Sequence, residues 1–267
     1  MLDITESTAE LKSCCANLYE SDWAKILLGD SFHPGGLALT RRLGKLLDLH
    51  PGQHILDVAA GKGTSAIFLA QQFGCRVTGI DFGTDTVAEA NSNAEKAGVT
   101  ELVQFEQGDA ENLHFDDTAF DAIICECAFC VFPNKSAAAH QFARVLRPGG
   151  QVGLSDLNRS GELPPELDTL LAWVACIADA RPVEDYTSTL QQAGFTINQV
   201  EPHNPALADM VRSVQGKLLG AEVMLKLDIL DLPDIDLSQA KSLVKHTAQA
   251  VQDGKLGYTL ITGKKDG

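Results

Sequence analysis

The sequence predicts an α/β protein with a doubly wound, mostly parallel sheet, and three observations carry that prediction. Residues 51–157 alternate short apolar runs with helical patterns, as expected of strands linked by crossover helices. Residues 54–82 contain a strand, a glycine turn, a helix and a second strand in that order. Residues 257–262 form a last apolar run that we expect to close the chain as a strand.

The first strand and the turn after it are the most informative part of the chain. Ile55–Val58 is a short apolar run between Pro51-Gly52 and a glycine turn, which is typical of a buried parallel strand. Gly61 and Gly63 permit positive φ and let the backbone come close to a ligand. The turn is therefore predicted to cradle a ligand at the carboxyl end of the strand.

A helix and a second strand complete this unit. Residues 65–73 carry apolar side chains at helical spacing, and Gly74 follows as a helix stop. Residues 76–80 form the next strand, and Asp81 lies at its end. An acid at this position can accept hydrogen bonds from both hydroxyls of a ribose, so the unit predicts a nucleoside-binding site.

Two classes of cofactor use such a site. Gly61, Gly63 and Ala66 fit the dinucleotide fingerprint loosely, so NAD is one candidate. Asp57 is an acid that would face a pyrophosphate unfavourably, but it suits a cofactor with a cationic amino-acid end. These residues alone leave both candidates open.

Motifs further along the chain decide between the two. Gly108-Asp109-Ala110 follows one predicted strand, residues 120–125 form another, and the sequence Arg-Pro-Gly-Gly at 147–150 precedes a third. In this order the motifs resemble the class I S-adenosylmethionine-dependent methyltransferases, over about residues 50–155. The resemblance implies a Rossmann-like methyltransferase fold with a seven-stranded sheet, an antiparallel closing strand, and S-adenosylmethionine as the cofactor.

The resemblance also implies which residues bind the cofactor. Ala59 stands where the family usually has its first glycine, a change that should narrow the turn without blocking it. The expected cofactor-binding residues are Asp57, Ala59, Gly61, Gly63, Asp81, Phe82, Asp109, Ala110 and Cys125.

Composition and charge restrict the class of partner. The chain has 267 residues and a formal net charge of −15, which argues against a nucleic-acid partner because phosphate binding needs clustered Lys and Arg. No apolar run reaches the roughly 18 residues of a membrane span, and the first residues lack the features of a secretion signal. Reduced cysteines are then expected, and with them a cytoplasmic enzyme whose acceptor is a small molecule or a metalloid. The oligomeric state is left open.

The chain divides into a core and helical additions. We predict a helical amino-terminal cap over residues 1–50, a cofactor-binding core over 51–204, a helical insertion over 205–253 and a closing strand within 254–267. After the fifth strand of the core, Pro164-Pro165 is predicted to open a helix over residues 167–178.

Three cysteines fall close together in the sequence. Cys125, Cys127 and Cys130 lie at the carboxyl end of the predicted fourth strand, the edge where open α/β sheets bind ligands. Cys125 and Cys127 would share a face if the strand continues that far. A single cysteine is more often a small buried residue, as we expect of Cys75. Three together favour a role near the transferable methyl group.

A narrower resemblance follows from the residues around these cysteines. The run Phe120–Lys135, the pair Ser155-Asp156, the sequence Glu-Leu-Pro at 162–164, and the predicted helix that holds Cys176 resemble the arsenite methyltransferases. On that resemblance Cys127 and Cys176 match the two cysteines that bind trivalent arsenic in the family.

The chain also departs from that family. Its segment before the first strand, residues 32–36, has no cysteine, and the family's cysteine-rich tail is absent. Cys130, or a thiol from Cys14 or Cys15, is a candidate for a third ligand.

The chemistry expected of such a site is simple. Thiolates are soft ligands that select soft centres, and three-coordinate As(III) keeps a lone pair that can attack a sulfonium methyl group. The reaction needs alignment, exclusion of water and thiols that ionise at the working pH, but no general base. A conventional O- or N-methyltransferase would need such a base, and Glu126, His33 and Asp156 are the candidates.

Two alternatives remain beside the metalloid hypothesis. One is methylation of a small organic acceptor, which includes small thiols, by a chain whose cysteines are structural. The other is a binding protein that senses or sequesters a metalloid or an oxidant without turnover. Formation of S-adenosylhomocysteine would separate this last function from the two enzymes.

Overall fold

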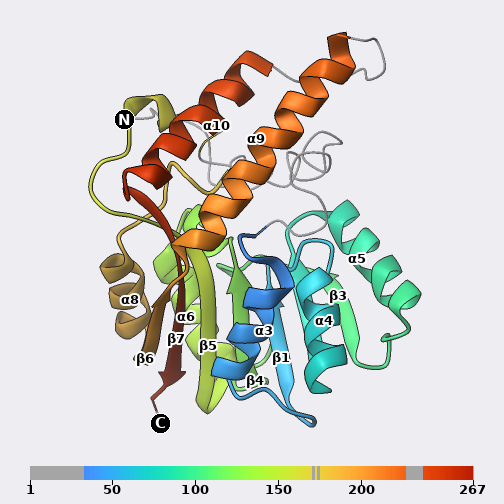
Figure 1. Cartoon of the computed structure of the whole chain (residues 1–267). Helices are drawn as coiled ribbons and strands as arrows, with labels where there is room; N and C mark the ends of the chain where they lie inside the picture. The colour runs from blue at the N-terminus through green and yellow to red at the C-terminus, as the bar shows by residue number, and fades with distance from the viewer. Residues whose placement is uncertain (1–32, 170–171, 173–174, 227–236, 267) are drawn as a thin grey trace.

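The computed structural model describes residues 33–169, 172, 175–226 and 237–266. Cys14, Cys15 and most of the predicted amino-terminal cap lie outside these residues. Within them, the predicted fold is confirmed: one seven-stranded, mostly parallel sheet has helices packed against it (Figure 1).

The sheet has the strand order β3-β2-β1-β4-β5-β7-β6. The strands are β1 (His54–Val58), β2 (Arg76–Asp81), β3 (Val103–Gln107), β4 (Phe120–Glu126), β5 (Leu146–Arg159), β6 (Phe195–Pro202) and β7 (Leu256–Lys265). The first five pair in parallel, whereas β7 runs antiparallel to both β5 and β6. The predicted antiparallel closing strand is therefore confirmed.

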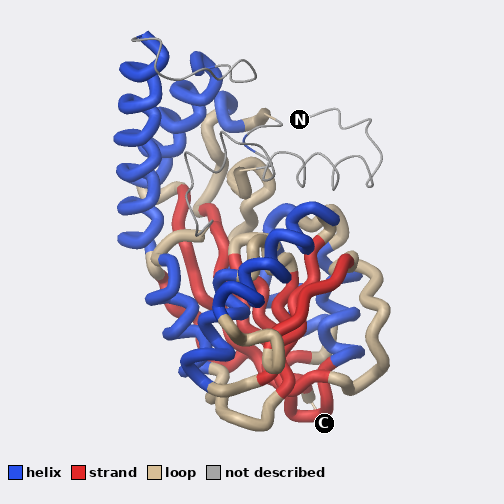
Figure 2. The backbone as a smooth tube through the Cα atoms, turned by 90° about the vertical axis from the view of Figure 1, so that its right-hand side faces the viewer, coloured by secondary structure: helices blue, strands red, loops and turns tan. Residues whose placement is uncertain are grey.

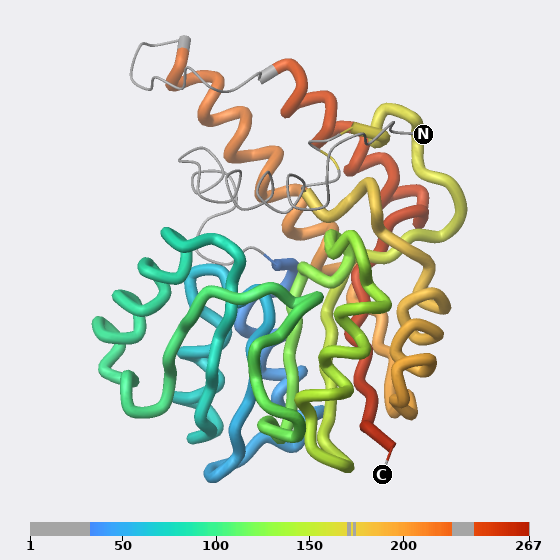
Figure 3. The backbone as a smooth tube through the Cα atoms, turned by 180° about the vertical axis from the view of Figure 1, so that it is seen from behind, coloured from blue at the N-terminus to red at the C-terminus, as the bar shows by residue number. Residues whose placement is uncertain are grey.

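Helices cover both faces of this sheet. They are α3 (Gly36–Leu46), α4 (Thr64–Phe73), α5 (Thr84–Ala97), α6 (Lys135–Val145) and α8 (Val183–Gln192). Figures 1 and 3 show α3 and α4 on one face and α6 and α8 on the other. Because both faces are covered, the central strands are apolar on both sides, and Ile55, Leu56, Ile123 and Ile124 are fully buried.

Two longer helices follow β6 in the chain. They are α9 (Asn204–Lys226) and α10 (Leu237–Gln252), which pack against each other. Figures 1 and 2 show the pair extending beyond the carboxyl ends of the parallel strands. Neither these helices nor any other in the described part of the chain is long and apolar enough to cross a membrane.

The helix predicted over residues 167–178 is wrong at both ends. A short 3-10 helix, η2 (Pro165–Leu167), begins at the second proline, and residues 175 and 176 lie in a turn. The amide of Ile177 donates to the carbonyl of Ala172 at 2.8 Å, and Cys176 has φ 64°. This is the geometry of a helix end whose left-handed position is usually glycine, so Cys176 terminates helical backbone instead of lying within it.

Candidate functional site

The turn after β1 is wound tightly. Ala59, Gly61 and Gly63 all have left-handed backbone, with φ of 58°, 53° and 78°. This conformation costs a residue with a Cβ atom about 1–2 kcal/mol, which is a physical reason for the glycine that the resembled family prefers at position 59. A Cβ atom at Gly63 would also lie 2.3 Å from the Phe105 ring, so this position tolerates no side chain.

Asp81 organises this turn from the end of the neighbouring strand. Its carboxylate accepts hydrogen bonds from the amides of Gly61, at 2.9 Å, and Gly83, at 3.1 Å. Because the same carboxylate faces the turn and lies at the end of β2, it can hold a polar ligand group beside the glycine backbone.

The remaining expected cofactor residues follow β2 and β3 at the same edge of the sheet. Phe82 comes directly after β2, and its carbonyl accepts a hydrogen bond from Gln107 at 3.0 Å. Asp109 accepts the amide of Glu111 at 3.0 Å, which shapes the loop after β3, and Ala110 is buried beside it. The structure thus brings these residues to the same end of the sheet as the glycine turn.

Asp57 is a buried acid with an unpartnered oxygen. It is 2 % exposed, and its Oδ2 atom has no hydrogen-bond partner. Burial raises the pKa of Asp57 well above its usual value, and the nearby charges of Glu126 and Asp81 raise it further. A cationic ligand group would donate a hydrogen bond to the Oδ2 atom of Asp57, and its positive charge would stabilise the ionised carboxylate.

Glu126 ends β4 beside Asp57, and hydroxyl groups from three elements hold it. Its carboxylate accepts hydrogen bonds from Ser65 at 2.6 Å, Thr40 at 3.0 Å and Ser155 at 3.3 Å. The Nε2 atom of His33 lies 3.6 Å away, and the side chain of Glu126 is 4 % exposed. Thr40 and Ser65 could not be identified from the sequence, because no motif marks them.

The thiols of Cys127, Cys130 and Cys176 lie together just beyond the carboxyl end of β4. The Cys176 thiol donates to the main-chain carbonyl of Cys127 at 3.2 Å, and it makes side-chain hydrogen bonds with both Cys127 and Cys130. β4 ends at Glu126, and Cys127 has φ 54°, so the strand alternation stops before Cys127. Cys125 and Cys127 therefore do not share a strand face.

The other two cysteines of the described chain are fully buried in the core. Cys125 lies within β4. Cys75 comes directly before β2, at the amino ends of the parallel strands, and its thiol donates to the carbonyl of Leu69 at 3.7 Å. Burial raises the pKa of Cys75 to about 11, so it remains a neutral thiol.

The pKa values of the site thiols are raised above their usual values, so the expected ionisation of these thiols beside a bound sulfonium stays a prediction. Hydrogen bonding with Cys176, then burial, raises the pKa of Cys127 well above its usual value. Burial is the first cause for Cys130 and Cys125. No group of three or more His, Cys, Asp or Glu side chains within the described residues is arranged to hold a metal ion.

Asp156 is a second buried acid, and it lies beside the thiol-bearing residues Cys130 and Cys176. Its carboxylate accepts the amides of Cys130 at 2.9 Å and Leu157 at 2.8 Å. Burial, then the charge of Cys176, raises the pKa of Asp156 to about 7. Aspartate often caps a turn or a helix, but Asp156 lies within β5 and does neither.

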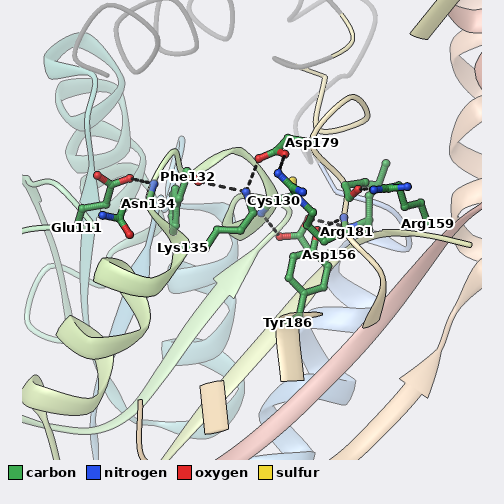
Figure 4. A network of polar contacts seen from close by, with 12 residues as sticks. Glu111, Cys130, Phe132, Asn134, Lys135, Asp156, Arg159, Asp179, Arg181 and Tyr186 are labelled. Carbon is green, nitrogen blue, oxygen red and sulfur yellow. Dashed lines mark hydrogen bonds and ion pairs between the residues drawn. The ribbon is translucent and has the colours of Figure 1, made fainter. Parts of the chain in front are cut away.

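A polar network holds the segment after Cys176 against the core (Figure 4). Lys135, at the start of α6, contacts Asp179 at 2.5 Å, and Asp179 also pairs with Arg181 at 2.5 Å. The hydroxyl of Tyr186 accepts the amide of Arg181 and donates to the carbonyl of Leu157, each at 3.0 Å. These contacts hold Asp179 and Arg181, which follow Cys176 closely in the sequence, against α6, α8 and β5, and no sequence motif marked them.

Comparison with known proteins places the fold and the site in context. Residues 55–150 match a family model described as a methyltransferase domain. A phosphoethanolamine N-methyltransferase 2 of Haemonchus contortus, solved with S-adenosyl-L-methionine, superposes with a TM-score of 0.79 at 19% identity, over 96% of this chain and 60% of that one.

Three relatives illustrate the range of similar sequences. Methyltransferase GfsG of Streptomyces halstedii is 26% identical, over 93% of this chain and 87% of its own. The 27-O-demethylrifamycin SV methyltransferase of Amycolatopsis mediterranei is 29% identical, with 85% and 82% covered. An arsenite methyltransferase of Halobacterium salinarum is 30% identical, but the match spans 57% of this chain and 39% of that protein.

Proposed function

We propose that this S-adenosylmethionine-dependent methyltransferase methylates a soft metalloid, such as arsenite, that is held by thiol groups. The observation that carries the proposal is the contact of the Cys176 thiol with those of Cys127 and Cys130. The similarity to an arsenite methyltransferase supports it.

The residues at the sheet edge fit S-adenosylmethionine. The unpartnered Oδ2 atom of Asp57 suits the ammonium group of the cofactor, and it would be unfavourable beside a pyrophosphate. Asp81 would hold the ribose hydroxyls, with Phe82, Asp109 and Ala110 around the base. When bound, S-adenosylmethionine supplies an electrophilic methyl group on a sulfonium centre.

Neutral thiols can still take up arsenite. Arsenous acid exchanges two hydroxide groups for the sulfurs of Cys127 and Cys176, and the two thiol protons leave with those groups as two water molecules. The raised thiol pKa values are therefore compatible with loading of the substrate. Serine could not replace the cysteines in this role, because its hydroxyl is a hard ligand for a soft centre.

The thiols then orient the lone pair of arsenic. As the carbon–arsenic bond forms, the carbon–sulfur bond of the sulfonium breaks and its electron pair stays on sulfur, which oxidises arsenic formally from the trivalent to the pentavalent state. No proton is removed from the acceptor, so the step needs no base. The contribution of the protein is alignment of the two reactants and exclusion of water.

A second candidate is methylation of a small organic acceptor, such as a thiol. One observation favours it: Asp156 is buried beside the thiols and has a pKa of about 7, which suits a general base. The similarity to the 27-O-demethylrifamycin SV methyltransferase, over 85% of this chain, is compatible with such an acceptor. The cysteines would then be structural.

The test is a screen of acceptors for release of S-adenosylhomocysteine. Arsenite, selenite and small thiols are each incubated with the protein and S-adenosylmethionine, and reactions without acceptor give the background. We expect arsenite-dependent release together with a methylated arsenic species by mass spectrometry. Release with small thiols alone would overturn the metalloid proposal, and no release with any acceptor would favour a binding protein.

A further inference from the structure

We infer that Glu126 is a second carboxylate for the ammonium group of S-adenosylmethionine, acting together with Asp57. The inference rests on the cofactor of the proposed function and adds a binding residue to it. It gives the buried cluster of Glu126, Thr40, Ser65 and Ser155 a role that the methyl-transfer step leaves unexplained.

The sheet register places the two carboxylates on one face. Asp57 of β1 pairs with Ile124 of β4 in the parallel ladder. Side chains alternate along a strand, so Glu126 projects to the same face as Ile124 and therefore to that of Asp57. Contacts from α4 agree, because Asp57 accepts the amide of Ala66 while Glu126 accepts the hydroxyl of Ser65.

Asp57 and Glu126 are two acids in a site that suits a cationic ligand group. Asp57 and Glu126 are both nearly inaccessible to water, at 2 % and 4 % exposed, and the charge of Glu126 raises the pKa of Asp57. A positive partner would favour the charged form of Asp57 beside this second acid. His33 is near Glu126, at 3.6 Å, but the Oδ2 atom of Asp57 stays without a partner.

The hydroxyl groups around Glu126 hold its carboxylate in one orientation. Thr40, Ser65 and Ser155 come from α3, α4 and β5, so the carboxylate is held from three sides before a ligand arrives. A carboxylate held in this way loses little side-chain entropy on binding. An ammonium group has donors for both acids, and it is the one cationic nitrogen that the amino-acid end of the cofactor offers.

The test compares two ligands that differ in one group. S-Adenosylhomocysteine carries the ammonium, and its deaminated analogue has hydrogen in that place. Calorimetry measures the affinity of both for the wild type, Glu126→Gln and the surface control Glu95→Gln. We expect Glu126→Gln to weaken S-adenosylhomocysteine by about tenfold or more and to change the analogue by less than about twofold, whereas Glu95→Gln changes neither.

Each outcome has a distinct meaning. Equal losses for both ligands in Glu126→Gln would assign the residue a structural role and overturn the inference. Unchanged affinity for both would overturn it as well. If the wild type binds neither ligand, the cofactor of the proposed function is itself wrong. Circular dichroism and the melting temperature of Glu126→Gln verify that the variant is folded, and Thr40→Val, which removes one of the hydroxyls, should show the same ligand selectivity in weaker form.

Discussion

The thiol of Cys176 donates a hydrogen bond to the main-chain carbonyl of Cys127 across 49 residues of sequence, and both cysteines have left-handed backbone. Such backbone costs a non-glycine residue about 1–3 kcal/mol. Glycine would relieve that cost at either position but would remove the thiol. The contact therefore joins two cysteines at positions where the backbone alone would favour glycine.

Serine in place of Cys127 or Cys176 should abolish methylation of arsenite, because a hydroxyl is a poor ligand for a soft centre. The affinity for S-adenosylhomocysteine should stay within about twofold of the wild type, since neither thiol is needed to bind the cofactor. Methylated arsenic is measured by mass spectrometry and affinity by calorimetry. Cys75→Ser is the matched control and should retain activity; equal losses in all three variants would point to a folding defect.

Alanine in place of Asp81 should weaken S-adenosylmethionine binding by about 1.5–3 kcal/mol, the range for a hydrogen bond to a charged group. Calorimetry measures the effect. Because Asp81 also accepts the amides of Gly61 and Gly83, Asp81→Asn serves as a milder variant that keeps one acceptor oxygen. Unchanged affinity in Asp81→Ala would refute the ribose assignment.

Removal of the candidate bases should have little effect if the acceptor uses its own lone pair. Asp156→Asn and His33→Ala should each retain turnover with arsenite to within about tenfold, well short of the usual contribution of a general base. Steady-state rates are compared after the cofactor affinity of each variant is known. A loss of about 10²–10⁴-fold at unchanged affinity would favour the organic acceptor. Glu126 is unsuitable for this test, because its variants should change cofactor binding.

Binding of S-adenosylhomocysteine should release a proton from Asp57. In the empty protein its raised pKa favours the protonated acid, whereas an ammonium beside it favours the charged carboxylate. The affinity for S-adenosylhomocysteine should therefore rise with pH between the pKa of Asp57 in the complex and its higher pKa in the free protein. Calorimetry in buffers of different ionisation enthalpy counts the released proton. Asp57→Asn should release none, and the same release from that variant would assign the proton elsewhere.

Asp156 should make the stability of the protein depend on pH. Its pKa is about 7 in the folded protein, whereas an unfolded aspartate titrates near about 3.9, so the folded state keeps a proton that the unfolded state has lost between these values. The free energy of unfolding should fall as pH rises through this window, by at most about 1.4 kcal/mol per pH unit. Urea denaturation of wild type and Asp156→Asn from pH 4.5 to 7.5 tests this, and identical slopes would contradict it.

The sequence by itself determined the sheet and the placement of the cofactor edge. Apolar runs, glycine stops and the turn around Gly61 are local signals, and they identified β1, α4 and β2 to within a residue. The parallel crossovers then force strand ends to a common edge, so Asp57 and Asp81 could be placed without coordinates.

Only the tertiary structure decided the details of the site. The end of helical backbone at Cys176 depends on its left-handed conformation, which the packing of the following segment through Lys135, Asp179 and Arg181 supports. The raised pKa of Cys127 depends first on its contact with Cys176, 49 residues away, and then on burial, and the unpartnered oxygen of Asp57 also depends on burial. Burial and contacts between distant residues arise when elements pack, and local periodicity carries no record of either.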